Sequence, residues 1–475
     1  MSWKSIDDFE MVVGLEVHVA LATRTKIYCG CVTRFGAAPN SQCCPVCLGY
    51  PGALPVLNRE AIRLAAKAGM ALECRVHPHS RQDRKNYFYP DLPKAYQISQ
   101  YDHPLCTRGR LRIETPAGEK TIGITRIHIE EDAGKLIHED GVTLLDLNRC
   151  GIPLIEIVSE PDIRTPDEAD AYLRKLRTIL RYAGVSECRM QEGEFRCDVN
   201  LSVHRADESF GTRTEMKNLN SFVSVTKAIE VEYRRQVDAL RKGEVIRQET
   251  RRFDQRTGDT YPMRRKENAN DYRFFPEPDL PPIILTEDTL QAWRDELPVL
   301  PDARKAACIA EYGLSSYAAE QIVSERAVAD YFASAAALTH APRMLSGLLL
   351  TEVFRLMDGD PASIRITPVQ LARLSDLAEA GEINVNTAKA VIAALWGTDE
   401  SPDAYIDRNH LRQISDEVLL RPLVRQAIED NPKMVAQYRA GKTAVKRGIM
   451  GAAMRLAAGR AAPEVMLRLV DEELE

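Results

Sequence analysis

The chain changes its pattern of apolar residues at one proline-rich stretch, and this change limits the folds open to it. From residue 1 to about residue 290, short segments alternate polar and apolar residues, which is typical of β-strands separated by loops. Residues 275–282 include four prolines, which end regular structure. From residue 302 on, alanine-rich segments carry apolar residues at the spacing of amphipathic helices. The sequence therefore predicts an α+β chain with a large, β-sheet-rich N-terminal domain followed by helices.

The length of the chain requires more than one domain. A single hydrophobic core stops growing well below 475 residues, so two to four domains are expected. A second break in the pattern falls at residues 397–402, which include Gly397 and Pro402. We therefore predict a large β-sheet-rich domain over 1–292, an all-α domain over 293–405 and a small helical tail over 406–475.

Charge and hydropathy exclude two broad classes of protein. The 63 basic and 69 acidic side chains give a net charge of −6, so the surface as a whole does not attract nucleic acid. Any site for a polyanion must be a local patch. The sequence has no apolar run of about 18 residues and begins without a targeting pattern, so we expect a cytoplasmic protein with no membrane association.

Four cysteines are spaced as a metal site. Ten of the eleven cysteines precede residue 200, and disulfides are not expected in a reducing compartment. Two close pairs supply four thiolates, the ligand set of structural zinc: Cys29, Cys31, Cys44 and Cys47. Cys43 is left over. The alternative is that these cysteines are small buried apolar residues.

Polar residues recur at alternate positions of four expected strands. In 13–21, Glu16 and His18 face away from the apolar side chains. Segments 126–132 and 196–204 repeat the pattern with His128, Glu130 and Asp198, and segment 151–158 contains one carboxylate, Glu156, in an otherwise apolar run. For one strand a solvated outer face is the simpler interpretation. Four such strands together favour a site for Mg²⁺ and phosphate, in which carboxylates hold the cation and guanidinium groups bind phosphate oxygens.

Two segments are candidates for nucleic-acid contact. Residues 431–460 contain seven basic residues and no acidic one, as a surface that follows a phosphate backbone would. Residues 81–96 interleave basic with aromatic side chains, as in single-strand stacking surfaces. A solvated helix face and a tyrosine-rich core are the respective alternatives. The sequence contains neither a Walker A loop nor G-x-G-x-x-G, so ATP would bind through another scaffold.

Taken together, these segments resemble the B-subunit family of the bacterial-type heterotrimeric glutamyl-tRNA(Gln)/aspartyl-tRNA(Asn) amidotransferases. The resemblance spans nearly the whole chain and rests on segments such as VGLEVHVAL, DRKNYFYPDLPKAYQISQYD, RIHIEEDAGKL, NRCGIPLIEIVSEPDIR and AGKTAVKRGIMGAAMRLAAGR. It implies a cradle-shaped N-terminal domain. It also implies an ATP-dependent ligase that phosphorylates the side-chain carboxylate of Glu-tRNA(Gln), Asp-tRNA(Asn) or both, and then transfers ammonia to it.

The same resemblance implies partners and cofactors. An amidase (glutaminase) subunit frees ammonia from glutamine, a small third subunit joins the two larger ones, and a cognate aminoacyl-tRNA synthetase is a further conceivable partner. The chain shows no amidase signature of the Ser-Ser-Lys type, which agrees with a separate source of ammonia. ATP, Mg²⁺ and a structural Zn²⁺ are the expected cofactors.

Site residues follow from matching the family's motifs to this sequence. The resemblance assigns catalysis and Mg²⁺ to Glu16, His18, Glu130, Glu131, Glu156 and Asp198. Alternation favours Glu130 over Glu131, although a bulge could reverse the two. Contacts to phosphate or to the tRNA 3′ end are implied for Arg84, Lys85 and Lys217, and contacts to tRNA for Lys442, Lys446 and Arg447.

Two other functions fit parts of the sequence. The chain could be a tRNA-binding scaffold without catalysis, but strand carboxylates would then repel the polyanion. A free-standing metallohydrolase that uses the cysteines is disfavoured, because four thiolates leave zinc no open position.

Overall fold

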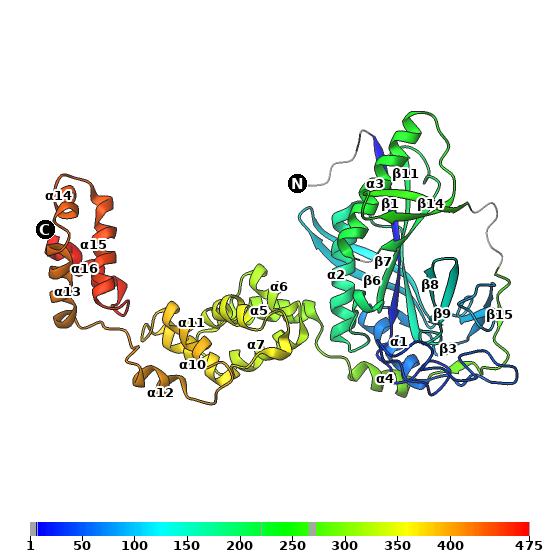
Figure 1. Cartoon of the computed structure of the whole chain (residues 1–475), viewed down its shortest axis with the longest axis horizontal. Coiled ribbons are helices and arrows are strands. Elements are labelled where there is room, and N and C mark those ends of the chain that lie inside the picture. The colour runs from blue at the N-terminus through cyan, green and yellow to red at the C-terminus, as the bar shows by residue number, and fades with distance from the viewer. Residues whose placement is uncertain (1–5, 7, 220, 266–271, 475) are drawn as a thin grey trace. The chain divides into compact units, whose positions relative to one another are not determined.

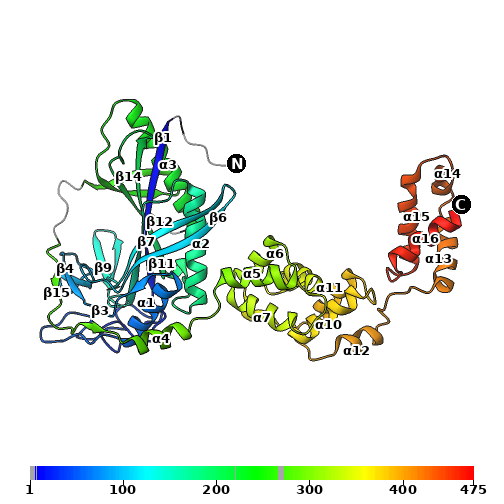
Figure 2. The same cartoon turned by 180° about the vertical axis from the view of Figure 1, so that it is seen from behind.

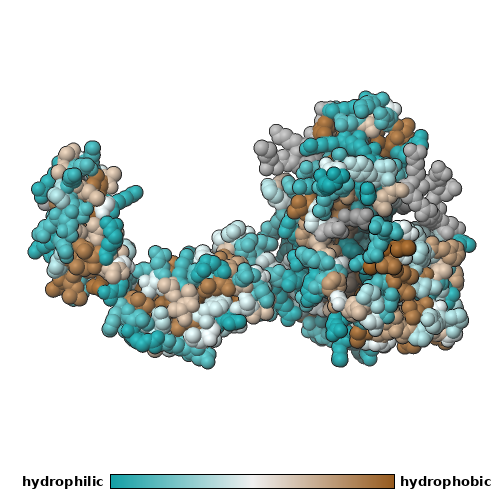
Figure 3. Space-filling model, in the orientation of Figure 1, coloured by the Kyte–Doolittle hydropathy of each residue, from teal (hydrophilic) through white to brown (hydrophobic). Residues whose placement is uncertain are grey.

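The computed structural model describes residues 6, 8–219, 221–265 and 272–474. It divides into two compact units, residues 1–300 and 301–475. The first is mainly sheet and the second is entirely helical, which confirms the predicted α+β class. In the view of Figure 3, the surface of each unit is largely hydrophilic and carries smaller hydrophobic patches. No helix in the described ranges is long and apolar enough to cross a membrane.

The first unit is built on a nine-stranded sheet. Its strands lie in the order β14-β13-β12-β11-β1-β10-β7-β6-β2, and all neighbours are antiparallel except β12 and β13. The strands are β1 (Phe9–Ala20), β2 (Arg75–Val76), β6 (Cys106–Thr115), β7 (Gly118–Glu131), β10 (Pro153–Ser159), β11 (Phe195–Arg205), β12 (Thr214–Leu219), β13 (Glu249–Asp254) and β14 (Asp259–Arg265).

Helices cover one face of this sheet (Figures 1 and 2). They are α1 (Arg59–Ala71), α2 (Pro166–Tyr182) and α3 (Phe222–Arg241), while α4 (Glu287–Asp295) packs against α1. The expectation that residues 1 to about 290 form strands and loops was wrong for these segments. Odd-numbered residues of β1 lie in the core beneath the helices: Val13, Leu15, Val17 and Val19 have no exposed surface. The even-numbered residues consequently point to the face that the helices do not cover.

Smaller sheets lie beside the main one. They pair β15 (Phe275–Pro276) with β4 (Asp83–Asn86) and β5 (Tyr96–Ser99), β16 (Ile283–Ile284) with β3 (His79–Ser80), and β8 (Lys135–Glu139) with β9 (Val142–Asp146). The proline-rich stretch therefore pairs back onto the first unit. That unit runs on through α4 to Leu300, beyond the residue 292 that we expected.

The second unit contains helices throughout. They are α5 (Pro301–Tyr312), α6 (Ser316–Val323), α7 (Arg326–Ala336), α8 (Pro342–Leu348), α9 (Phe354–Leu356), α10 (Pro368–Glu379), α11 (Val385–Ala394), α12 (Pro402–Arg408), α13 (Glu417–Glu429), α14 (Pro432–Arg439), α15 (Lys446–Leu456) and α16 (Pro463–Leu474). The last four pack around a core of their own, which includes Leu420, Ile449 and Leu469. The predicted division at residue 405 stays a prediction.

Candidate active site and metal centres

Strand register brings the polar residues of four strands into one row. On β1, His18 lies opposite Glu156 of β10 and opposite Arg196 of β11. Glu156 in turn lies opposite His128 of β7. Because neighbouring residues of paired strands point to the same face, all four side chains stand on the face that the helices leave uncovered.

The first group of possible metal ligands lies in the middle of this row. The Nε2 atom of His18 is 3.4 Å from Oε1 of Glu130 and 3.3 Å from Oε2 of Glu156. His128 approaches the same Glu156 oxygen, at 3.4 Å from its own Nε2. One ligand atom from each of His18, Glu130 and Glu156 can lie within 4.8 Å of the others, so the three could hold one cation.

The charges of this group interact strongly and shift one another's pKa values. Burial alone would lower the pKa of both imidazoles, but Glu156 and Glu130 raise the pKa of His18 and raise that of His128 to about 9. Burial likewise opposes ionisation of Glu156, yet the two histidines hold its pKa well below the ordinary value. The site thus favours ionised carboxylates together with a compensating positive charge, which protons or a bound cation could supply.

A second group of possible ligands lies next to the first. Oxygen atoms of Glu16, Asp198 and Glu215 can come within 4.8 Å of one another. Asn200 Nδ2 donates to Glu16 Oε1 at 2.8 Å, and Lys217 Nζ lies 2.7 Å from Asp198 and 3.1 Å from Glu215. Burial, followed by the charge of nearby Glu156, raises the pKa of Glu16. Oxygen-rich ligands of this kind suit Mg²⁺.

Two arginines on the same face retain hydrogen-bonding capacity. Arg126 and Arg196 each have a buried Nε that donates no hydrogen bond. A terminal nitrogen of Arg196 lies 3.0 Å from Asp132, which holds that guanidinium in place. Buried donors without acceptors are costly, so both arginines fit an anionic ligand such as phosphate.

Glu131 points to the other side of β7. Both of its carboxylate oxygens lie 2.6 Å from Lys94 Nζ, and the backbone N–H of Ile98 donates to Oε1 at 2.9 Å. This pair borders a cavity of about 130 Å³ that is also lined by Tyr28 and Tyr96. The structure therefore places Glu130 with the possible metal ligands and Glu131 against a lysine.

The four predicted cysteines come together at the edge of that cavity. Their sulfur atoms all lie within 4.8 Å of one another, and the backbone N–H of Cys44 donates to Cys47 Sγ at 3.1 Å. A hydrogen bond from Cys29 lowers the pKa of Cys47 to about 4, and burial raises that of Cys31 to about 11. Cys43 instead lies 3.8 Å from Asn148. Four convergent thiols fit a tetrahedral metal site.

Known proteins match this chain over nearly its whole length. Residues 11–291 match the family model described as the GatB/GatE catalytic domain, and residues 330–474 match the GatB domain. The B subunit of the aspartyl/glutamyl-tRNA(Asn/Gln) amidotransferase of Caldanaerobacter subterraneus is 50% identical, and that of Caldicellulosiruptor saccharolyticus 48%, each over 98% of this chain and 99% of the relative. The Clostridium botulinum protein of the same name is 46% identical over equal shares.

The chain belongs to the B-subunit family of the aspartyl/glutamyl-tRNA(Asn/Gln) amidotransferases. This membership confirms the resemblance stated from the sequence.

In this B-subunit family member, the three residues expected to contact phosphate or the tRNA 3′ end differ from one another in their surroundings. Arg84 binds Glu277 through two nitrogens, at 2.7 and 2.8 Å, and its guanidinium lies 4.3 Å from the centre of the Tyr96 ring. Lys85 Nζ lies 4.8 Å from the centre of the Tyr272 ring. Arg84 is thus already engaged by a buried carboxylate, whereas Lys217 forms ion pairs with two carboxylates of the second group, Asp198 and Glu215.

In the tail, the three residues expected to contact tRNA differ in whether they form an ion pair. Lys442 and Arg447 are exposed, and within the described ranges neither forms an ion pair. Lys446 pairs with Asp471 of α16. Residues 431–460 contain no acidic residue, but the fold places Asp471, from outside that range, against Lys446.

Sequence reasoning missed Glu215 as a member of the site. Its signal was available, because Glu215 and Lys217 are two residues apart on the short strand β12 and therefore share a face. Register then sets Glu215 opposite Asn200 of β11, beside Asp198.

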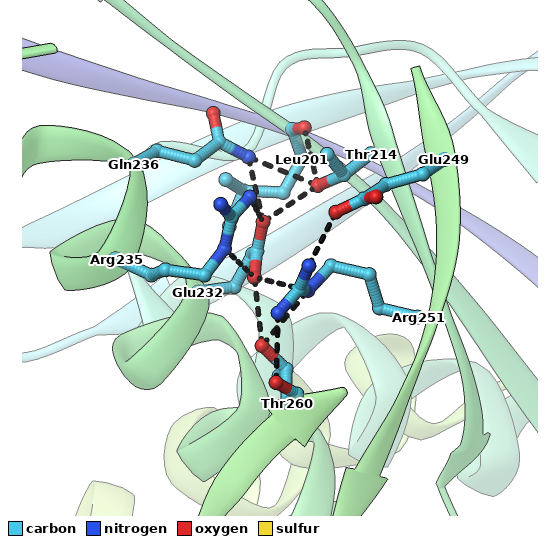
Figure 4. Close-up of polar contacts among 8 residues, drawn as sticks. All are labelled: Leu201, Thr214, Glu232, Arg235, Gln236, Glu249, Arg251 and Thr260. Carbon is cyan, nitrogen blue, oxygen red and sulfur yellow. Dashed lines mark hydrogen bonds and ion pairs between the residues drawn. The ribbon is translucent and has the colours of Figure 1, made fainter. Parts of the chain in front are cut away.

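A buried network behind β12 ties this strand to helix α3 (Figure 4). The carboxylate of Glu232, which has no exposed surface, accepts hydrogen bonds at 2.9 Å from Thr214 and Thr260. The same carboxylate binds Arg235 of its own helix, and lies 3.2 Å from Arg251 of β13. Glu215 directly follows Thr214, so this network also fixes the strand that carries Glu215 and Lys217.

Proposed function

We propose that this chain is the component that amidates mischarged aminoacyl-tRNA in a glutamine-dependent amidotransferase, a carbon–nitrogen ligase. Its substrates are Glu-tRNA(Gln), Asp-tRNA(Asn) or both, and its partners are the amidase subunit of that enzyme together with the small third subunit. Relatives named as B subunits of this enzyme align over nearly their whole length, which supports the assignment.

One observation supports the catalytic role above the others. Two groups of carboxylate and imidazole ligands stand side by side on the uncovered face of the sheet, next to arginines with unused donors. A tRNA scaffold gains nothing from such a concentration of negative charge, which would repel RNA. A site for ATP phosphates requires it, because the acidic residues hold the cations that accompany the nucleotide.

The reaction would proceed in two steps. A carboxylate is a poor electrophile, so an oxygen of the substrate's side chain first attacks the γ-phosphorus of ATP and ADP departs. Ammonia then attacks the acyl carbon, the bond from that carbon to the phosphate oxygen breaks, and phosphate leaves with the amide formed after loss of a proton.

Residues of this chain would bind and orient the reactants. The groups His18–Glu130–Glu156 and Glu16–Asp198–Glu215 would hold Mg²⁺, which supplies neutralisation of phosphate charge when bound. Arg126 and Arg196 would donate to phosphate oxygens, and Asn200 and Lys217 would keep the carboxylates beside them oriented. The ammonia would come from the amidase subunit.

The cysteines would hold a structural zinc ion. Residues 22–58, all of which the structure describes, form neither a helix nor a regular strand. Four thiolates from this segment would cross-link it around one Zn²⁺ and leave that ion no open position for catalysis.

The tail would contribute tRNA binding through exposed basic residues such as Lys442 and Arg447. Cytoplasmic location is part of the same proposal, since aminoacyl-tRNA is used there in translation.

Amidation assays test the function directly. The complex of this chain with its two partner subunits should convert mischarged tRNA to the amide when ATP, Mg²⁺ and glutamine are present, and should release ADP only when mischarged tRNA is added. Ammonium chloride should replace glutamine when the glutaminase is chemically blocked. Failure of amidation with both Glu-tRNA(Gln) and Asp-tRNA(Asn) would contradict the proposal.

A further inference from the structure

Lys26 is a buried lysine whose ammonium group lies against the cysteine cluster. Its side chain has no exposed surface. Nζ lies 3.6 Å from Cys47 Sγ and 3.4 Å from the carbonyl oxygen of Leu147. Within the described ranges, no carboxylate pairs with it. Buried lysines elsewhere in the molecule do have such partners: Lys67, for example, lies 3.4 Å from Glu296.

An ammonium group without a counter-charge is costly to bury. One carbonyl oxygen removes only part of this cost, because it carries a partial charge. Among the described residues, the other polar contact of the ammonium group is the sulfur of Cys47, and a thiolate there would provide the missing negative charge. The position of Lys26 therefore indicates that the cluster is anionic in the folded protein.

The charge of an occupied four-thiolate site requires a cation in return. A divalent metal and four thiolates together carry a net charge of −2, which is costly in a partly buried position. Lys26 would halve this charge. It also spans the two cysteine pairs, because its backbone N–H donates to the carbonyl oxygen of Cys31 at 2.9 Å while its side chain reaches Cys47.

We propose that Lys26 is the counter-charge of the four-cysteine metal site, that it donates a hydrogen bond to a metal-bound Cys47 thiolate, and that retention of the metal depends on it. Lys26 is not a metal ligand. It acts through Cys47, as residues outside the ligand set do when they orient and stabilise a ligand.

Zinc retention in full-length variants tests this role. Lys26→Met keeps the length of the side chain and removes its charge, and the matched control is Lys67→Met, which changes a buried lysine distant in sequence from the cysteines. Each protein is purified with zinc, its zinc content is measured, and transfer of zinc to a chromogenic chelator is followed. We expect an affinity about 10–100-fold lower in Lys26→Met than in the unaltered chain.

The possible outcomes distinguish failure of the role of Lys26 from failure of the metal site itself. Zinc content near one equivalent in the unaltered chain, with equal affinity in Lys26→Met, would overturn the role of Lys26 alone. An unaltered chain without zinc would overturn both the metal site and the role of Lys26. If Lys26→Met fails to fold, Lys26→Arg and Lys26→Gln replace it: Arg must retain zinc better than Gln, and equal loss in the two would overturn the proposal.

Discussion

At the scale of single residues, Glu16 and Asp198 each supply a separate anionic ligand to the candidate site. Glu16 and Asp198 face one another across paired strands, and Asn200 and Lys217 hold them in place by a hydrogen bond and an ion pair. Replacing either carboxylate by its amide keeps the shape and removes one anionic ligand.

We expect Glu16→Gln and Asp198→Asn each to lower the ATP cleavage that depends on mischarged tRNA by about 100-fold or more, because cation binding loses a ligand. Affinity for tRNA should change little, since these residues carry no positive charge. The measurement is ADP release by the assembled complex, together with tRNA binding. Glu10→Gln, an exposed position on the same strand, is the control and should leave both unchanged.

Formation of the phosphorylated product at normal rate in both variants would contradict the catalytic assignment. In that case the scaffold function would account better for the chain.

Much of this site could be predicted because strand alternation is local. Period two alone placed Glu16, His18 and Asp198 away from the core. Which strands are neighbours could not be predicted, because β1 pairs with strands well over a hundred residues further along the chain. For the same reason the occupation of Arg84 by Glu277 was missed.

At the scale of elements, helix α3 and strands β12 to β14 depend on one buried carboxylate. Glu232 binds Arg235, Arg251 and two threonines with no water-exposed surface, so its loss leaves a buried arginine partly unpaired.

We expect Glu232→Gln to lower the free energy of unfolding by about 3 kcal/mol, as breaking a buried ion pair does. Although burial opposes ionisation, Arg235 and Arg251 lower the pKa of Glu232 below its ordinary 4.5. Its contribution is therefore present above about pH 4.5 and is lost as the pH falls through the lowered value. Denaturant unfolding across this range should show the variant and the unaltered chain converge at acid pH. Glu230→Gln, half-buried on the same helix, should cost far less.

A constant difference between Glu232→Gln and the unaltered chain down to acid pH would show that the charge of Glu232 is not what stabilises this region.

The segment before α1, residues 22–58, contains neither a helix nor a regular strand, so the proposed zinc ion would be its main cross-link. We expect the purified chain to contain about one zinc per molecule and Cys44→Ser/Cys47→Ser to contain none, because two of four ligands are lost. Metal analysis measures this. Cys43→Ser is the matched control, since Cys43 contacts Asn148 and should leave zinc in place. An unaltered chain without zinc would return these cysteines to the role of buried apolar residues.

At the scale of the whole molecule, the tail is set apart by its own core. Leu420, Val424 and Leu469 pack with residues of the last four helices, whereas α10 to α12 pack among themselves. Removal of the tail should consequently leave the remaining units folded.

We expect a chain that ends at Arg408 to bind tRNA more weakly and with a flatter dependence on salt, because exposed cations such as Lys442 and Arg447 no longer displace counterions. Binding measured between about 50 and 200 mM salt gives the slope. The double variant Lys442→Ala/Arg447→Ala should flatten the slope in part, and Arg355→Ala, outside the tail, should leave it unchanged. Equal tRNA affinity after removal of the tail would refute this role.

Strand β7 limits which changes of sequence this protein can tolerate. Glu130 contacts His18 on one face of β7, and Glu131 contacts Lys94 on the other face. Two consecutive residues of this strand therefore belong to two different sites. Inserting or deleting one residue just before Glu130 would turn both carboxylates to the opposite faces of the sheet and separate each from its partner. Substitutions can alter either side separately, but the spacing of this strand is not free to vary.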